Sequence, residues 1–136
     1  MDPLQRLHRA WKAKPLAITL VFALVPVGVI VLVFGDSADW AFATIGGGGI
    51  IIRYMGILMI LGGAFVAYSV IRKDAFYEVL GLTFAALGTA VYGVGILLGF
   101  GAEGLITGLG YVSMTLAFLG RVALLCRSAK IAASEP

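Results

Sequence analysis

The sequence predicts an all-α integral membrane protein whose four helices form a bundle. Hydrophobic residues make up 61% of the 136 residues and charged residues only 12%, whereas a soluble domain carries about 25% charged residues. A soluble core of this size is too small to hide so many apolar side chains. Charged residues are absent from four long stretches: 15–35, 54–71, 79–102 and 104–120.

Each uncharged stretch is about as long as a membrane-spanning helix. A bilayer core needs roughly 17–25 residues of helix, and the backbone in lipid must satisfy its own hydrogen bonds. The spans are therefore expected at 15–34, 50–71, 77–100 and 104–126. The connections are short, so sequence neighbours run antiparallel. The membrane bundle then covers residues 15–126, and residues 127–136 form a cytoplasmic tail.

Residues 1–14 precede the first span and carry basic side chains. Asp2 is a good helix cap and Pro3 suits a first turn. Leu4, Leu7 and Trp11 share one helical face, while the basic residues lie elsewhere. This pattern predicts a short amphipathic helix at the cytoplasmic membrane surface. A solvated basic flank that only sets topology remains the alternative.

The basic residues predict the orientation. Lysine and arginine in short loops mark the cytoplasmic side, and nine of the ten fall on one side of the four-span arrangement. The other side carries Asp36, Asp39 and Glu103, with Arg53 as its only base. Both termini are therefore expected in the cytoplasm of a bacterial cell, with the chain in its plasma membrane. Because the basic residues are split among three membrane-proximal segments, no nucleic-acid binding is expected.

A run of glycines, TIGGGGIIIRYMGILM, raises the question of a phosphate-binding loop. Such a loop needs a lysine after its last glycine, and a dinucleotide fingerprint needs a strand before it. Neither is present in the sequence. The glycines are better explained by helix packing, because small residues let backbones approach closely in a membrane.

Two of the predicted helices carry glycine at seven-residue spacing, which keeps residues on one face of a helix. The residues are Gly49, Gly56 and Gly63 on one helix and Gly81, Gly88 and Gly95 on the next. We expect the two stripes to face each other, with Gly56 nearest Gly88. The alternative is that one stripe faces a second copy of the chain.

Further small residues predict more contacts between helices. Gly81, Ala85, Thr89 and Gly93 form a second line on the third helix, so this helix is expected to touch two neighbours. The fourth helix carries Gly104 and Gly108 as a GxxxG motif, followed by Ser113, Ala117 and Gly120.

Two arginines lie near the ends of the predicted spans. Arg53 is expected at the outer interface, paired with Asp36, Asp39 or Glu103. Recognition of an anion or substrate is the alternative for Arg53. Arg121 is likewise expected to lie at the cytoplasmic interface, within reach of Asp74 or Glu78.

The sequence offers little for catalysis or ion coupling. It contains no paired carboxylates, no cysteine–histidine or serine–histidine arrangement and no metal-ligand cluster. We therefore expect no enzyme, no cofactor and no metal, and the sequence identifies no small-molecule ligand. No charged residue lies near the middle of a predicted span, which disfavours a proton-coupled transporter.

The layout resembles small four-helix membrane proteins of actinobacterial phages. The resemblance rests on LHRAWKAKP, IIRYMGILMILGG and YEVLGLTFAALGTAVYGVGILLG. Some proteins of this kind are holins, which assemble in a membrane and permeabilise it. The resemblance implies a holin-like, non-catalytic protein that forms homo-oligomers in the bilayer. An accessory subunit of a larger membrane complex is the alternative, and a small channel or transporter is the third possibility.

Overall fold

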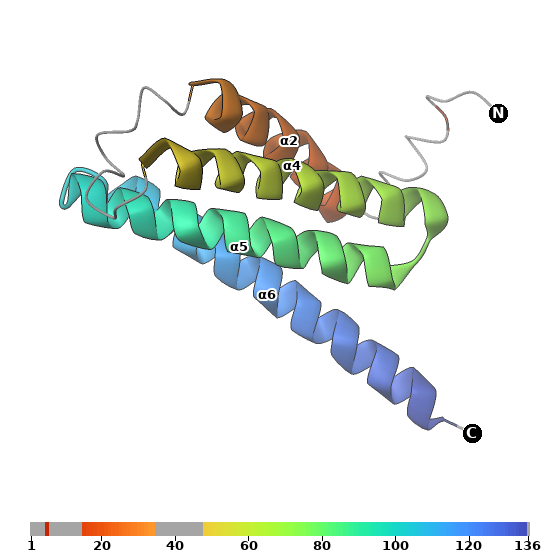
Figure 1. The fold of residues 1–136 in the computed structure, drawn as a ribbon. Coiled ribbons are helices and arrows are strands. Elements are labelled where there is room, and N and C mark those ends of the chain that lie inside the picture. The colour runs from red at the N-terminus through yellow and green to blue at the C-terminus, as the bar shows by residue number, and fades with distance from the viewer. Residues whose placement is uncertain (1–4, 6–14, 35–47, 136) are drawn as a thin grey trace.

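The computed structural model describes Gln5, residues 15–34 and residues 48–135, and these residues form four helices (Figure 1). The helices are α2 (Pro15–Phe34), α4 (Gly48–Arg72), α5 (Ala75–Phe100) and α6 (Leu105–Ser134). The prediction of an all-helical fold is confirmed for the described residues. The surface helix predicted over 1–14 lies outside the described residues.

Three of the helices, α4, α5 and α6, are long and apolar enough to cross a membrane. The apolar stretch of α2 is shorter, Ile18–Val33. Pro26 lies inside α2, where its ring removes one backbone hydrogen bond. Helices therefore lie at all four predicted spans, but the predicted end of the fourth helix at residue 126 is wrong, because α6 continues to Ser134.

The helix boundaries follow local chemistry. Between α4 and α5, Lys73 has a positive φ of 57°, and the Asp74 side chain caps α5 by accepting a hydrogen bond from the Phe76 amide at 2.9 Å. Between α5 and α6, Gly101 has a φ of 55°, which costs glycine little. These turns define two ends of the molecule. The hairpin end comprises residues 72–75, and the opposite end comprises residues 101–104.

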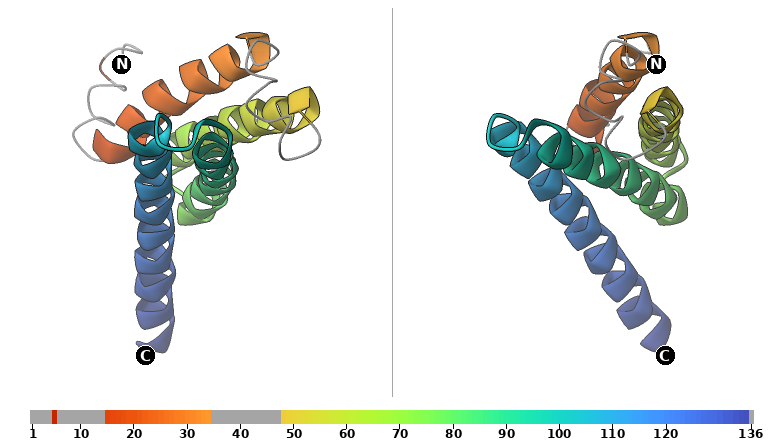
Figure 2. Two further views of the ribbon diagram at one scale, coloured as in Figure 1. Left: turned by 90° about the vertical axis from the view of Figure 1, so that its left-hand side faces the viewer. Right: turned by 60° about the vertical axis from the view of Figure 1, so that its left-hand side comes forward.

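Each helix packs against the next one in the sequence: α2 on α4, α4 on α5 and α5 on α6. Within the described residues α2 and α6 have no comparable contact, so the helices form an open arc. Figures 1 and 2 show α6 crossing the others obliquely and projecting away from them toward its C-terminus.

The core lies along the shared interfaces of the arc. One cluster joins all four helices through Leu24, Val66, Leu82 and Phe118. A second cluster, nearer the opposite end, contains Val31, Ile52 and Met55.

Candidate functional site: glycine contacts and the open face of α6

Each of the three helix interfaces contains a reciprocal pair of glycines. The pairs are Gly28 with Gly56, Gly62 with Gly81, and Gly93 with Gly108. In every pair, a Cβ atom added to one glycine would lie 2.7–3.2 Å from the carbonyl oxygen of the other. The backbones therefore touch directly, which is the close approach that holds membrane helices together.

The first interface corrects the predicted pairing of the glycine stripes. Gly56 lies against Gly28 of α2, and a Cβ at Gly63 would meet the Val25 side chain of α2 at 2.6 Å. This face of α4 thus contacts α2, so the prediction that it faces the α5 stripe, with Gly56 nearest Gly88, is wrong. Gly49 is half-buried at the start of α4.

The second interface uses a neighbouring face of α4. Gly62 and Gly63 are adjacent in the chain, and successive residues of an α-helix are about 100° apart, so the two glycines point to different neighbours. A Cβ at Gly62 would lie 2.8 Å from the Ala85 amide nitrogen. A Cβ at Gly88 would lie 3.1 Å from the Met59 side chain. The α5 stripe therefore does face α4, and its third member, Gly95, is also buried.

The third interface joins α5 to α6. Next to the Gly93–Gly108 pair, the rings of Tyr92 and Tyr111 meet edge to face with their centroids 4.8 Å apart. A Cβ at Gly104 would lie 2.8 Å from the Ile96 carbonyl oxygen. The first glycine of the GxxxG motif therefore allows the close approach of α5 at the turn before α6. The expectation that the third predicted helix touches two neighbours is confirmed, since α5 packs against both α4 and α6.

Polar contacts continue the α5–α6 interface toward the hairpin end. The hydroxyl oxygens of Thr89 and Thr115 are 2.9 Å apart and form a buried hydrogen bond. Each hydroxyl oxygen also lies 2.9 Å from a backbone carbonyl oxygen of its own helix. Each hydroxyl has one proton, so one threonine donates to its carbonyl oxygen and the other donates across the interface. This geometry satisfies both hydroxyls inside an apolar interface.

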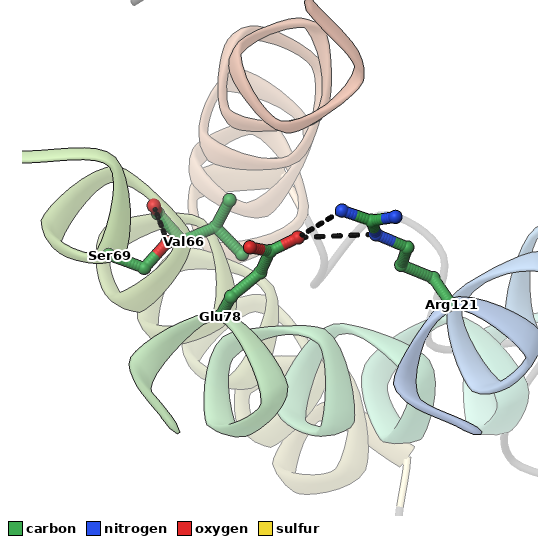
Figure 3. A network of polar contacts seen from close by, with 4 residues as sticks. All are labelled: Val66, Ser69, Glu78 and Arg121. Carbon is green, nitrogen blue, oxygen red and sulfur yellow. Dashed lines mark hydrogen bonds and ion pairs between the residues drawn. The ribbon is translucent and has the colours of Figure 1, made fainter. Parts of the chain in front are cut away.

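An ion pair between Arg121 and Glu78 closes the interface near the hairpin end (Figure 3). The Nη2 and Nε atoms of Arg121 donate to Oε1 of Glu78 at 3.1 and 3.3 Å. The Glu78 side chain is 3% exposed, whereas the Arg121 side chain is 41% exposed. The sequence-based expectation that Arg121 reaches Glu78 is confirmed. Glu78 gains further from its place in the first turn of α5, where the helix dipole favours negative charge.

The expected pairing of Arg53 with an acid at the outer interface stays a prediction. Arg53 is exposed in the second turn of α4, and Glu103 is exposed in the turn before α6. Asp36 and Asp39, the other expected partners, lie outside the described residues.

A groove of about 200 Å³ lies between α2 and α6. Ala23 and Val27 form one wall and Gly110 and Met114 the other, with Met59 of α4 at its base. The lining is almost entirely apolar, although Thr89 and Thr107 contribute to it. Within the described part of the chain, no group of three or more acidic, histidine or cysteine side chains is placed to hold a metal.

The outward face of α6 is the least covered helical surface among the three long helices. Only 11% of its most apolar stretch is buried, compared with 39% in α4 and 50% in α5. Small side chains form a line along this helix that begins at the groove: Gly110, which also lines the groove, Ser113, Ala117 and Gly120 are all exposed. A Cβ at Gly110 or Gly120 would meet no atom within 4 Å. We call these four residues the α6 small face.

No protein family, curated protein or solved structure matches this chain. The fold alone therefore defines its class. The described residues form an all-helical fold of four helices, three of which are long and apolar enough to cross a membrane.

Proposed function

We propose that the chain is an integral membrane protein of the bacterial plasma membrane, with four spans and both termini in the cytoplasm. Support comes from the apolar lengths of α4, α5 and α6 and from the distribution of lysine and arginine along the sequence. α2 then supplies the fourth span. The hairpin end lies at the cytoplasmic interface and the opposite end faces outward.

The length of α6 fits this orientation. Its 30 residues extend about 45 Å, which exceeds the ~30 Å hydrocarbon core. Arg121 lies 16 residues after Leu105, about 24 Å along the axis. Arg127 and Lys130 then lie beyond the hydrocarbon, where charged groups are solvated. Arg127 and Lys130 therefore cost little in a membrane, while Arg121, which lies inside the ~30 Å core by this measure, is paired with Glu78.

Self-assembly through the α6 small face is the function that the geometry supports best. The three glycine pairs are already used inside one chain, so they are not available for assembly. The exposure of α6 is the observation that carries the proposal. The small residues on its exposed surface repeat at spacings of three and four, which places them on one face of the helix. Such a face allows two helices to approach closely in lipid.

Permeabilisation of the membrane by these assemblies, as holins do, is the activity we propose. The α6 face also suits a helix of a larger membrane partner, in which case the chain is an accessory subunit. Collapse of the membrane potential separates the two, since an accessory subunit alone does not depolarise a cell.

The test is expression in a bacterium whose membrane potential is followed with a dye. We expect an abrupt collapse with the natural chain and none with Ala117→Leu, which places a bulky side chain on the α6 small face. Ala64→Leu is the matched control, because Ala64 is an exposed alanine on α4. No collapse with the natural chain in the membrane favours the accessory subunit. Equal collapse with Ala117→Leu contradicts assembly through α6.

A further inference from the structure

The hairpin end combines exposed aromatic and basic side chains. Arg72 and Lys73 lie at this end, Tyr68 and Phe76 lie beside it in the last turns of α4 and the first turn of α5, and all four are exposed. Phe76 is 64% exposed. We call these four residues the hairpin-tip patch.

The orientation of Arg72 is set by its own helix. Its Nε atom donates to the Tyr68 hydroxyl at 3.1 Å, and its guanidinium carbon lies 5.6 Å from the centroid of the Tyr68 ring. A residue four positions earlier lies directly below on the helix surface, and a guanidinium within about 6 Å of a ring is attracted to it. The cation is thus held against the aromatic side chain.

The aromatic part of the patch is held by its neighbours. The Tyr77 ring lies edge to face with both Tyr68, at 4.7 Å between centroids, and Phe76, at 5.6 Å. The ring of Phe65 stacks beneath Tyr77 at 6.4 Å. Contacts of this kind position rings well, so the patch is a supported platform.

The positive charge of the patch is not compensated within the described residues. Neither Arg72 nor Lys73 forms an ion pair with any described carboxylate. The nearest acid in the sequence is Asp74, and its side chain caps α5 by accepting from the Phe76 amide. Two neighbouring cations therefore remain for an external anion.

The backbone at Lys73 adopts a conformation that is uncommon for a residue with a side chain. Lys73 has a φ of 57°, a conformation that costs a side-chain-bearing residue roughly 1–2 kcal/mol. Glycine is the usual residue just after a helix end, and the chain uses 19 glycines elsewhere. A lysine at a strained position in an exposed turn is compatible with a role for its ammonium group.

We propose that the hairpin-tip patch binds the phosphate of an anionic phospholipid in the leaflet that it meets. Charge complementarity selects an anionic headgroup, and the guanidinium and ammonium supply charge-assisted hydrogen bonds to phosphate. The exposed rings fit the boundary between headgroups and acyl chains, where aromatic residues are enriched. The inference rests on the proposed membrane location, and it does not depend on permeabilisation.

Native mass spectrometry of the detergent-solubilised protein tests the proposal by titration with phosphatidylglycerol or phosphatidylcholine. We expect phosphatidylglycerol to bind more tightly. Arg72→Gln and Lys73→Gln should each weaken its binding about fivefold, the equivalent of roughly 1 kcal/mol per cation at a membrane surface. Tyr68→Phe, which loses the hydroxyl and keeps the ring, should weaken it less.

Arg127→Gln is the matched control, because Arg127 is an exposed arginine on α6 with no aromatic partner among the described residues. Its phosphatidylglycerol affinity should equal that of the natural chain. An equal loss of phosphatidylglycerol affinity in Arg127→Gln overturns the proposal, since the affinity then depends on basic charge anywhere in the chain. Equal binding of the two lipids also overturns it, and so does displacement of phosphatidylglycerol by inorganic phosphate at matching concentration. Failure of these tests leaves the depolarisation result unaffected.

Discussion

Substitution of Gly62 by alanine tests whether direct backbone contact holds α4 against α5. The added methyl group would lie 2.8 Å from the Ala85 amide nitrogen and 2.9 Å from the Gly81 carbonyl oxygen. Both are backbone atoms, so no side-chain rotation can relieve the contact. Ordinary contact begins near 3.4 Å, and the helices must therefore separate by about half an ångström, with loss of dispersion contacts along the interface.

Gly110→Ala is the matched control for this experiment. A Cβ at Gly110 meets nothing within 4 Å, and both positions lie inside helices. Alanine therefore gains helix propensity, about 1 kcal/mol, in both variants. The difference between the two variants removes this common gain and leaves the overpacking cost, about 1–3 kcal/mol.

The assay is equilibrium unfolding of the monomer in mixed micelles of increasing SDS content. Gly62→Ala should be less stable than Gly110→Ala by about 1–3 kcal/mol, while Gly110→Ala should be as stable as the natural chain or more so. If Gly62→Ala is as stable as Gly110→Ala, the interface accommodates a methyl group and the close-contact reasoning is refuted.

Three further predictions concern charge, backbone strain and topology. Arg121→Gln should cost about 1–2 kcal/mol in the same assay, below the value for a fully buried pair because Arg121 is 41% exposed, and an equal loss in Arg127→Gln would refute it. Lys73→Gly should raise the free energy of unfolding by about 1 kcal/mol, because it relieves the positive φ, and a loss of stability would contradict the strain. A reporter enzyme fused after Pro136 should be active only in its cytoplasmic form, and periplasmic activity would rule out the four-span arrangement.

The helices can be predicted because long uncharged stretches have few alternatives in an apolar environment. Uncharged stretches of sufficient length leave the backbone only the helix, and the short connections fix the order of neighbours. The predicted end of α6, residue 126, is too early, because the helix continues to Ser134. The sequence RSAKIAAS contains neither glycine nor proline to stop a helix, so the signal for the longer helix is present.

The faces of the helices cannot be predicted equally well. Gly62 and Gly63 are adjacent, and a seven-residue spacing selects Gly63 although Gly62 makes the contact with α5. The spacing also does not predict that Gly56 and Gly63 contact α2. This helix carries only one glycine, Gly28, and a single residue has no periodicity. Which neighbour lies on which side of α4 is a tertiary property that spacing along one helix does not contain.

The ion pair at Glu78 is predictable because few acids lie near Arg121 in the four-span arrangement. The open arc cannot be predicted from the sequence, because it depends on whether α6 packs against α2. Neither helix carries a charge near the middle of its span that would indicate such a contact. The small residues of α6 are visible in the sequence. Their exposure becomes evident only when the three glycine pairs are assigned to contacts within the chain.

Cysteine cross-linking in native membranes tests the central claim, assembly through the α6 small face, most directly. Cys126 is the only cysteine of the chain, so Cys126→Ser gives a background in which single cysteines are added by Ala117→Cys or Ala64→Cys. Mild oxidation should give a disulfide-linked dimer with Ala117→Cys and monomer with Ala64→Cys. Monomer in both variants, or dimers of equal yield in both, would contradict assembly through α6.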